Sequence, residues 1–442
     1  MGGPSGDDSF DGLAPQSALG TLAFGVARLQ SGDKLVLLDG TYVEQFLVNV
    51  SGEPGAPILI EAQNDGAAII DGEGLRAPCR IDGPQSPRIH DIVVRGLRCQ
   101  NSSAEAFLVA DAENVTLQRI TVFTPEPGSN GMWVLRSKNV LVEDSAVSAD
   151  VRLLFSAFLS QNVTFRRCWG QRTGTSGNGY VVFGIDQSDN TALINCVGTM
   201  TPGSGGVNGV VILDSSNALV LGNIMLGLNG YGYITSSATG INYQGTVMRH
   251  NVSANPLHEG GGSGSLFQRA DANLVVQNCT LVHADSSAIN INPIGVSNPA
   301  PDFALNLDIS NSVILEANKG FTSATDPQIG SIVHRFNNLF AVTTPYTNLT
   351  ADPTEFSTDP LFDTNRYGPG AYLIRPANLS TLGESGGAVG AEVLYQYDTT
   401  GNLTQLPLWP WPMDERILLE TGISVTHAGS GGLWNTLDGV YP

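Results

Sequence analysis

A short motif that recurs along most of the chain restricts it to a repeat architecture. Nine segments align without gaps on one anchor residue, and a weaker tenth begins at Ser331. Self-similarity at a nearly constant spacing indicates a solenoid, in which one repeat cannot bury its own interior and stacked neighbours supply the stability. The nine anchors lie 23 to 33 residues apart; they are Asp91, Asn114, Asn139, Asn162, Asn190, Asn217, Gly245, Asn273 and Asn306.

The pattern inside a repeat indicates short strands joined by tight turns. Positions one and three after the anchor are mostly apolar, as in Val115 and Leu117, and this is the alternation of a strand. Position five is often Gly or Asn, for example Gly96 and Asn278, and both tolerate the left-handed conformation that a tight turn needs. Apolar residues resume at positions six and eight. The alternation therefore slips by one residue, and the chain bends with its apolar side inward.

Three strands per repeat predict the fold class. A further apolar strand precedes each anchor, such as MWVL before Asn139. We expect an all-β chain, a single-stranded right-handed parallel β-helix in which each coil rises about 4.8 Å. A β-sandwich does not repeat one offset pattern so often, and a propeller blade needs four strands and about 40 residues.

The anchors should form a ladder of Asn amides. The predicted inward column is Val115, Val140, Val163, Thr191, Ala218, Thr246, Leu274 and Leu307, with Leu117, Val142, Phe165 and Leu193 in a second stack.

Charge and hydropathy exclude several classes of protein. The 41 acidic residues against 21 Lys and Arg leave a net charge of −20, which argues against nucleic acid, because phosphates need a basic surface. No stretch approaches the roughly 18 consecutive apolar residues of a membrane span. The opening residues MGGPSGDDSF lack the basic and apolar regions of a signal peptide.

The five Cys match no zinc-binding pattern. Cys168 and Cys196 share position six in successive repeats, where we expect buried free thiols rather than a disulfide, because stacked parallel side chains aim poorly for that bond. Asn223 and Asn251 continue the same position. A small polar ladder, and not a metal site, is therefore predicted inside the coils.

Three segments are predicted along the chain. Residues 1–20 are an arm or a cap, residues 21–392 form the right-handed parallel β-helix, and residues 393–442 do not fit the repeat. The last segment holds Trp409 and Trp411 between prolines. Since the end of a β-helix exposes an open strand edge, we expect this segment to be a cap. The alternative is an interface for self-association through the two Trp residues, because buried Trp is a common interface anchor.

Both ends of the repeat region carry a family resemblance. The opening stretch resembles the first coils of secreted right-handed β-helix proteins, a group that includes polysaccharide lyases acting on alginate and chondroitin. Asp359-Pro-Leu-Phe and Gly386-Gly-Ala-Val-Gly-Ala-Glu resemble the closing coil of the same group. The resemblance implies an extracellular or cell-envelope location and a polysaccharide or glycan partner. The residues that carry it at the opening are Gly32, Asp33, Gly40, Tyr42, Pro57 and Ile58.

The chemistry of that group is not carried over with its fold. The lyases use a Lys and Arg pair with a calcium site, but Lys occurs only at Lys34, Lys138 and Lys319, away from the central loops. Their Arg-His-Gly type motif is missing, because Arg249-His250 is followed by Asn251 at a turn. The Gly-His-Gly of hydrolases and the Asp-Pro-His-Glu of epimerases are absent too. Calcium is kept as a candidate cofactor, since it would offset repulsion between an acidic surface and polyuronates.

The longest insertions should lie along one edge of the solenoid, a usual place for a binding face. His258 and Glu259 lie in such an insertion, and Arg269 follows on the next strand. We name these three as candidate catalytic residues: His258 as a base and Arg269 as the cation for a carboxylate. The alternative is a solvated loop tip beside an exposed strand residue. The insertions are residues 124–131, 171–179, 199–209, 253–265 and 292–302.

Three further residues are candidates for substrate binding. Tyr231 and Tyr233 belong to the preceding coil and could stack on a sugar ring. Asp186 shares the column of Arg269 but lies three coils away, about 14 Å, so the two cannot form one direct catalytic pair. The sequence thus supports an extracellular protein that binds or processes polysaccharide, lyase-like if it is an enzyme. The alternative is a non-catalytic structural or adhesive rod.

Overall fold

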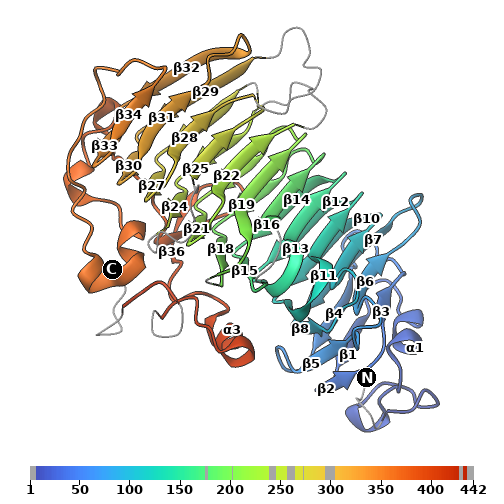
Figure 1. The fold of residues 1–442 in the computed structure, drawn as a ribbon. Helices are drawn as coiled ribbons and strands as arrows, with labels where there is room; N and C mark the ends of the chain where they lie inside the picture. The colour runs from blue at the N-terminus through green and yellow to red at the C-terminus, as the bar shows by residue number, and fades with distance from the viewer. Residues whose placement is uncertain are drawn as a thin grey trace. The chain divides into compact units, whose positions relative to one another are not determined.

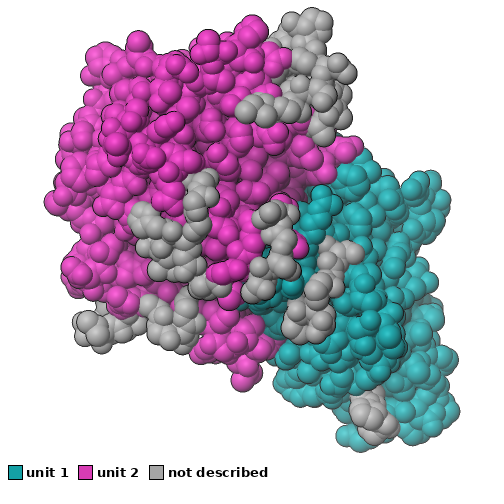
Figure 2. All heavy atoms as spheres, in the orientation of Figure 1, with its two compact units in different colours: residues 1–174 teal, residues 175–442 magenta. Residues whose placement is uncertain are grey.

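The computed structural model describes residues 6–174, 178–201, 203–237, 245–255, 264–271, 273–293, 304–427 and 432–435. The chain packs as two compact units, residues 1–174 and residues 175–442 (Figure 2). Both are built from coils of short parallel strands stacked on one another (Figure 1). The predicted parallel β-helix is confirmed.

The first strand of each of the nine repeats begins within two residues of its anchor, and first strands pair in parallel with those of the neighbouring coils. In unit 1 they are β1 (Lys34–Leu37), β4 (Ile58–Ala62), β7 (Ile89–Arg95), β10 (Ala112–Gln118), β12 (Lys138–Glu143) and β14 (Gln161–Arg166). In unit 2 they are β17 (Ala192–Ile194), β20 (Leu219–Leu221), β23 (Val247–Arg249), β26 (Leu274–Gln277), β29 (Leu305–Ser310) and β32 (Ile329–Arg335).

The second strands follow the turn at position five. In unit 1 they are β2 (Gly40–Tyr42), β5 (Ala68–Asp71), β8 (Leu97–Gln100), β11 (Thr121–Leu135), β13 (Ala146–Phe158) and β15 (Trp169–Arg172). In unit 2 they are β18 (Val197–Met200), β21 (Ile224–Leu226), β24 (Val252–Ala254), β27 (Thr280–Val282), β30 (Val313–Leu315) and β33 (Asn338–Phe340).

The third strands close each coil. Unit 1 has β3 (Phe46–Val48), β6 (Cys79–Asp82) and β9 (Phe107–Ala110), which pairs with the end of β11. Unit 2 has β16 (Asn178–Asp186), β19 (Gly206–Leu213), β22 (Tyr231–Ser236), β25 (Gly264–Gln268), β28 (Ser287–Ile291), β31 (Lys319–Ser323) and β34 (Thr344–Thr347).

The register confirms the predicted columns. Val115 pairs with Val140 and Val140 with Val163, while Leu117, Val142 and Phe165 stack in the same way. All eight residues of the predicted inward column are at most 2% exposed. The interior position-six ladder is also present, since Asn223 donates from its backbone to the Asn251 side-chain oxygen at 2.9 Å. Cys168 and Cys196 are buried free thiols, as predicted.

The anchors form the expected amide ladder, and their backbones adopt the left-handed conformation. Asn114, Asn139 and Asn162 have φ between 52° and 56°, and each of the last two donates its side-chain N–H to the amide oxygen one coil before, at 3.1 and 2.9 Å. Position five is left-handed as well, with φ of 71° at Gly96 and 53° at Asn278. Asn stabilises this conformation locally, so the backbone bends at the same place in every coil.

One predicted loop is wrong. Residues 124–131 were expected to form an insertion at the edge, but they lie inside the fifteen-residue strand β11, which pairs with β13 through a register shift between Thr124 and Gly128. Second and third strands are continuous here. The Pro and Gly residues that suggested a loop are accommodated by this irregularity, because a bulge tolerates a residue that cannot donate to the ladder.

Short segments cover the ends of the described coils. Helix α1 (Leu22–Ala27) buries Leu22 and Val26 beside β3. At the last coil, Phe356 bridges to Asn338, and the Glu355 carboxylate accepts hydrogen bonds from the Tyr346 hydroxyl and the Asn337 amide.

The predicted role of residues 393–442 as a cap or an interface stays a prediction. Trp409 and Trp411 are 4% and 2% exposed and pack with Trp434 inside the tail. Self-association through these two indoles would require the tail to open. The tail also contains the strands β35 (Tyr395–Tyr397) and β36 (Leu403–Pro407), which pair antiparallel, and the helix α3 (Asp414–Thr421).

A disulfide joins Cys79 on β6 to Cys99 on β8. The sequence analysis did not foresee it, because the two residues lie on different strands of successive coils and share no repeat position. Among the described residues, no helix has the length and apolar character to cross a membrane.

Candidate functional site

The outward face of the third strands in unit 2 carries an aromatic cluster with a cation beside it. Tyr231 lies at the start of β22, and Phe267 lies on the neighbouring strand β25, with ring centroids 4.9 Å apart. The guanidinium of Arg269 lies over the other side of this cluster, 5.6 Å from the Phe267 ring centroid. All three side chains are half-buried, so part of each is open to solvent. We call Tyr231, Phe267 and Arg269 the aromatic platform.

Strand alternation aims the Phe267 side chain outward. Leu266 and Gln268, on either side of Phe267, are at most 2% exposed and face the interior. The ladder continues the outward column from Phe267 to Asn290 on β28. The Asn290 amide donates to the Tyr231 hydroxyl at 3.4 Å, so the Tyr231 ring reaches across β25.

Gly264 makes room for the Tyr231 ring. It is the ladder partner of Tyr231, and a Cβ at this position would overlap carbon Cε1 of the ring and the backbone oxygen of Ser287. A residue with a side chain would therefore push the ring away from the sheet. The small residue and the large one together form a flat surface.

This arrangement can bind a ring-shaped ligand that carries negative charge. Aromatic faces offer large, rigid, apolar contact area, and a guanidinium matches a carboxylate in a two-pronged geometry. Ligand sites in general combine aromatic lining with a few placed polar groups, here Arg269 and Asn290. No proton-transfer group is part of the platform itself.

The structure brings together two of the six residues that the sequence analysis named. Tyr231 and Arg269 both belong to the platform. Tyr233 instead faces the interior: it is 2% exposed, and its hydroxyl donates to the backbone oxygens of Asn223 and Val252 at 3.1 and 3.0 Å. Burial raises its pKa far above the usual value. Its ring is a core residue and is not available to a sugar.

The remaining predicted residues are placed as follows. Asp186 pairs with Leu213, and Leu213 pairs with Ser236, which lies beside Arg269. It is therefore three strands from Arg269, as the repeat offsets predicted. His258 and Glu259 lie outside the described residues, so their roles stay predictions.

Phe267 and Asn290 are the members of this surface that the sequence reasoning missed. The strand before Asn273 contains a signal for an outward aromatic residue. Leu266 and Phe267 are adjacent and apolar, and adjacent residues of a strand face opposite sides, so one of the two must face outward. The tetrad Leu-Phe-Gln-Arg is one of the strands that precede an anchor, but its composition alone does not decide which side chains point outward.

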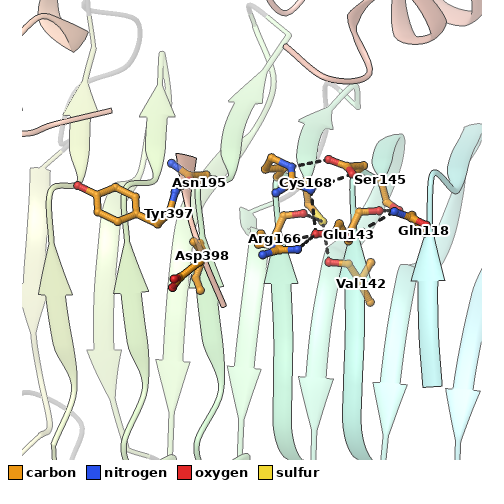
Figure 3. Close-up of polar contacts among 12 residues, drawn as sticks. Gln118, Val142, Glu143, Ser145, Arg166, Cys168, Asn195, Tyr397 and Asp398 are labelled. Carbon is orange, nitrogen blue, oxygen red and sulfur yellow. Dashed lines mark hydrogen bonds and ion pairs between the residues drawn. The ribbon is translucent and has the colours of Figure 1, made fainter. Parts of the chain in front are cut away.

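A second polar cluster lies in unit 1 and has a different character. The Glu143 carboxylate, 9% exposed, accepts hydrogen bonds from Arg166, Arg167 and Gln118, and Arg167 also binds Asp144 at 2.6 Å (Figure 3). The acidic neighbours raise the pKa of Arg167 although burial opposes this. Since these charges neutralise one another, the cluster leaves little for a ligand.

Calcium finds no obvious ligand set in the part of the chain that the structure describes. No group of three or more His, Cys, Asp or Glu side chains lies close enough there to hold a metal ion.

No family model matches the chain, and no curated protein matches it. Solved structures do share its fold. The A-module of the mannuronan C-5 epimerase AlgE4 from Azotobacter vinelandii is 14% identical over 74% of this chain and 91% of its own, with a TM-score of 0.50. Pectate lyase Pel9A is 17% identical over 88% and 94%, with a TM-score of 0.47.

A PL6 family polysaccharide lyase from Pseudopedobacter saltans is 13% identical over 75% of this chain and 95% of its own, with a TM-score of 0.48. At such identities the likeness shows the fold alone. The chain is a β-solenoid of the parallel β-helix type that pectate, alginate and other polysaccharide lyases adopt.

Proposed function

We propose that this protein binds an acidic polysaccharide on the outward face of β22, β25 and β28, in an extracellular or cell-envelope setting. The observation that carries the proposal is the aromatic platform, in which two touching rings lie beside a guanidinium. A pyranose ring would lie against Tyr231 or Phe267, and a uronate carboxylate would face Arg269.

The overall charge makes Arg269 important for this function. A chain with a net charge of −20 repels a polyanion at long range, so a bound uronate needs a local cation. Arg269 supplies one directly after β25, where its backbone N–H donates to the oxygen of Thr235 at 2.8 Å. A rigid scaffold lowers the entropy that binding would otherwise cost.

The Cys79–Cys99 disulfide supports the proposed location. Disulfides persist in oxidising compartments and are rare in the reducing cytosol. The same bond joins two successive coils, so it also stiffens unit 1.

A binding experiment tests the proposal. The full chain is titrated with polymannuronate, polyguluronate and polygalacturonate, with neutral glucan as the comparison, and affinity is measured by calorimetry. We expect Arg269→Gln to weaken binding of polyuronates about tenfold, which corresponds to roughly 1.4 kcal/mol, the scale of one charge-assisted hydrogen bond. Phe267→Ala should weaken binding of every ligand that binds.

Matched controls are available in unit 1. Arg152 is an exposed Arg on β13, and Phe24 is a 39% exposed Phe on α1. Arg152→Gln and Phe24→Ala should leave affinity unchanged. Equal affinity of the wild type and both platform variants for polyuronates would refute the site.

Catalysis is a separate part of the proposal. A lyase forms an unsaturated product that absorbs in the ultraviolet, so absorbance is followed with each polyuronate. We propose His258 as the base, with Arg269 facing the carboxylate of the same residue of the sugar chain. Product formation that His258→Ala abolishes would support this role, whereas binding without product would establish a non-catalytic binding protein.

A further inference from the structure

The tail of unit 2 runs back along the turns of its own coils. The Glu384 backbone N–H donates to the Asn311 side chain at 2.8 Å, and the Asn278 amide donates to the Ala388 oxygen at 2.7 Å. Farther along, the Tyr397 backbone N–H donates to the Asn195 amide oxygen at 2.6 Å (Figure 3). The acceptors and donors on the coils are the left-handed residues at position five. We call residues 384–397 the strap.

Tyr397 anchors the strap in an apolar patch. Its ring is 4% exposed and packs with Ile194 and Leu221. It also lies against Gly222, where any side chain would collide with ring carbon Cε2. The strap thus covers apolar side chains that would otherwise face solvent.

His250 is the position-five residue beneath the strap, and its surroundings require it to be neutral. The Tyr397 ring stacks on the imidazole with centroids 5.9 Å apart and planes at 22°. Arg375 places its Nη2 3.3 Å from His250 Nδ1. Since a guanidinium has only donors, Nδ1 must accept this hydrogen bond and cannot carry a proton.

The charges around His250 also oppose its protonation. Burial first, and then the positive charges of Arg375 and Arg249, lower the pKa of His250 to about 3. The acid that faces this cluster is Glu392, whose carboxylate lies 3.7 Å from Arg375. The Tyr397 hydroxyl donates to the backbone oxygen of Glu392 and adds no charge.

We propose that the strap is an acid-released latch, in which proton uptake by His250 frees residues 384–397 from the turns and uncovers Ile194 and Leu221. A proton on Nδ1 would face an Arg donor and place a third positive charge beside those of Arg375 and Arg249. Arg375 lies outside the strap, but its guanidinium is 3.7 Å from the Glu392 carboxylate within it, so Arg375 is drawn away when the strap detaches. Detachment removes this conflict, because the imidazole then enters water without Arg375 and Tyr397 against it.

The direction of the pH effect follows from the two protonation states. A released His250 has the ordinary pKa of about 6.5, whereas the latched one stays neutral far below that value. Latching is therefore complete above about pH 6.5 and weakens by up to tenfold for each pH unit below it. At pH 4.5 the latched state should be about 100-fold less favoured than at pH 7.5.

Hydrogen exchange measured by mass spectrometry on the full chain tests the latch. Rates are corrected for the intrinsic effect of pH, and peptides covering residues 384–397 are compared with peptides from β26. We expect protection of the strap to fall about 100-fold between pH 7.5 and pH 4.5, while β26 stays protected. His250→Gln keeps Glu392 and removes the titrating ring, so the strap should then be equally protected at both pH values.

Two further variants keep the test decisive. Arg375→Gln removes the opposing charge and should reduce the acid effect even if His250→Gln does not fold. His90→Gln changes a 41% exposed His in unit 1 and should leave the acid effect as it is in the wild type. Equal protection of the wild-type strap at both pH values, or acid release that persists in His250→Gln, would overturn the proposal.

Discussion

Unit 1 and the first two coils of unit 2 place opposite kinds of side chain at the same strand position. At position four, the outward end of each first strand, unit 1 has polar and charged residues that pair along the column, with Glu143 between Gln118 and Arg166. The first two coils of unit 2 have Ile194 and Leu221 there, and both are at most 3% exposed. Backbone geometry and register are alike in the two columns.

The difference teaches that the coil decides where a side chain points but not whether it is buried. In unit 1, neighbouring charges satisfy one another along the ladder and the side chains meet solvent at their edges. In unit 2, the tail returns and the Tyr397 ring covers the aliphatic pair. An outward position is therefore apolar where a later segment of the chain packs on it and polar where it meets solvent.

Removing the cover in unit 2 should have the largest effect. Tyr397→Ala deletes a buried ring and its hydrogen bond to Glu392, so we expect the free energy of unfolding to fall by about 4 kcal/mol. Denaturant titration measures this loss. Tyr395→Ala, two residues away and 41% exposed in the wild type, is the control and should cost less than about 0.5 kcal/mol. Similar losses in both variants would mean that the ring is not what holds the tail.

Asp271 is a buried carboxyl for which the described residues provide no ion pair, and it sharpens the contrast with Glu143. Asp271 in unit 2 is 3% exposed, and burial raises its pKa to about 6 although the Asn273 backbone N–H donates to it at 3.0 Å. Because the folded pKa lies above the unfolded value of 3.8, the stability present below pH 4 is lost as pH rises through 6. The expected loss is about 3 kcal/mol by pH 7.

Thermal melts between pH 4 and pH 7 measure this loss. Asp271→Asn cannot ionise, so its melting curve should lack the decline that is assigned to Asp271. Asp186→Asn, a half-buried carboxyl on the same side of the coils, is the comparison and should keep the decline. A decline that persists in Asp271→Asn would assign it to another group.

Breaking the charge ladder of unit 1 should have the smallest of these effects. Glu143→Gln leaves Arg166 and Arg167, which are 18% and 12% exposed, with one carboxylate fewer, and we expect a loss of about 2 kcal/mol, since Arg167 keeps Asp144. Denaturant titration at low and high salt is the measurement. Glu61→Gln is the control, because its partner Lys34 is 51% exposed and such surface pairs contribute about 0.5 kcal/mol or less. An equal cost for both would show that burial of the ladder does not matter.

Much of the fold could be predicted because the alignment of the repeats gives the register in which their strands pair. The Val115, Val140 and Val163 column, the left-handed anchors and the interior Asn223 and Asn251 ladder all follow from one alignment. The third strand of unit 2 was harder. Tyr231 and Tyr233 are two residues apart, so regular alternation would place both rings on one face and could not tell that Tyr231 faces outward and Tyr233 inward.

The candidate site was predicted in part for the same reason. Arg269 follows the strand β25, and the structure places its guanidinium beside the Phe267 ring, while its role at a site stays a prediction. The sequence did not mark Phe267 as a surface residue, because a single aromatic residue in a strand usually lies in the hydrophobic core. Gly264 gave no signal at all, since its role depends on a ring one coil away.

The sequence by itself determined the coil: which residues point inward, where the chain turns and which positions stack. These features repeat, and each copy is set by contacts within about 30 residues of the chain. The tertiary structure alone decided the Cys79–Cys99 bond, the burial of Trp409 and Trp411 and the path of the strap over His250. The partners of these residues are not repeated along the chain and come from other coils or from the tail, so no local sequence pattern encodes the pairing. The pairing arises when the coils stack and the tail packs against apolar and hydrogen-bonding groups on their surface.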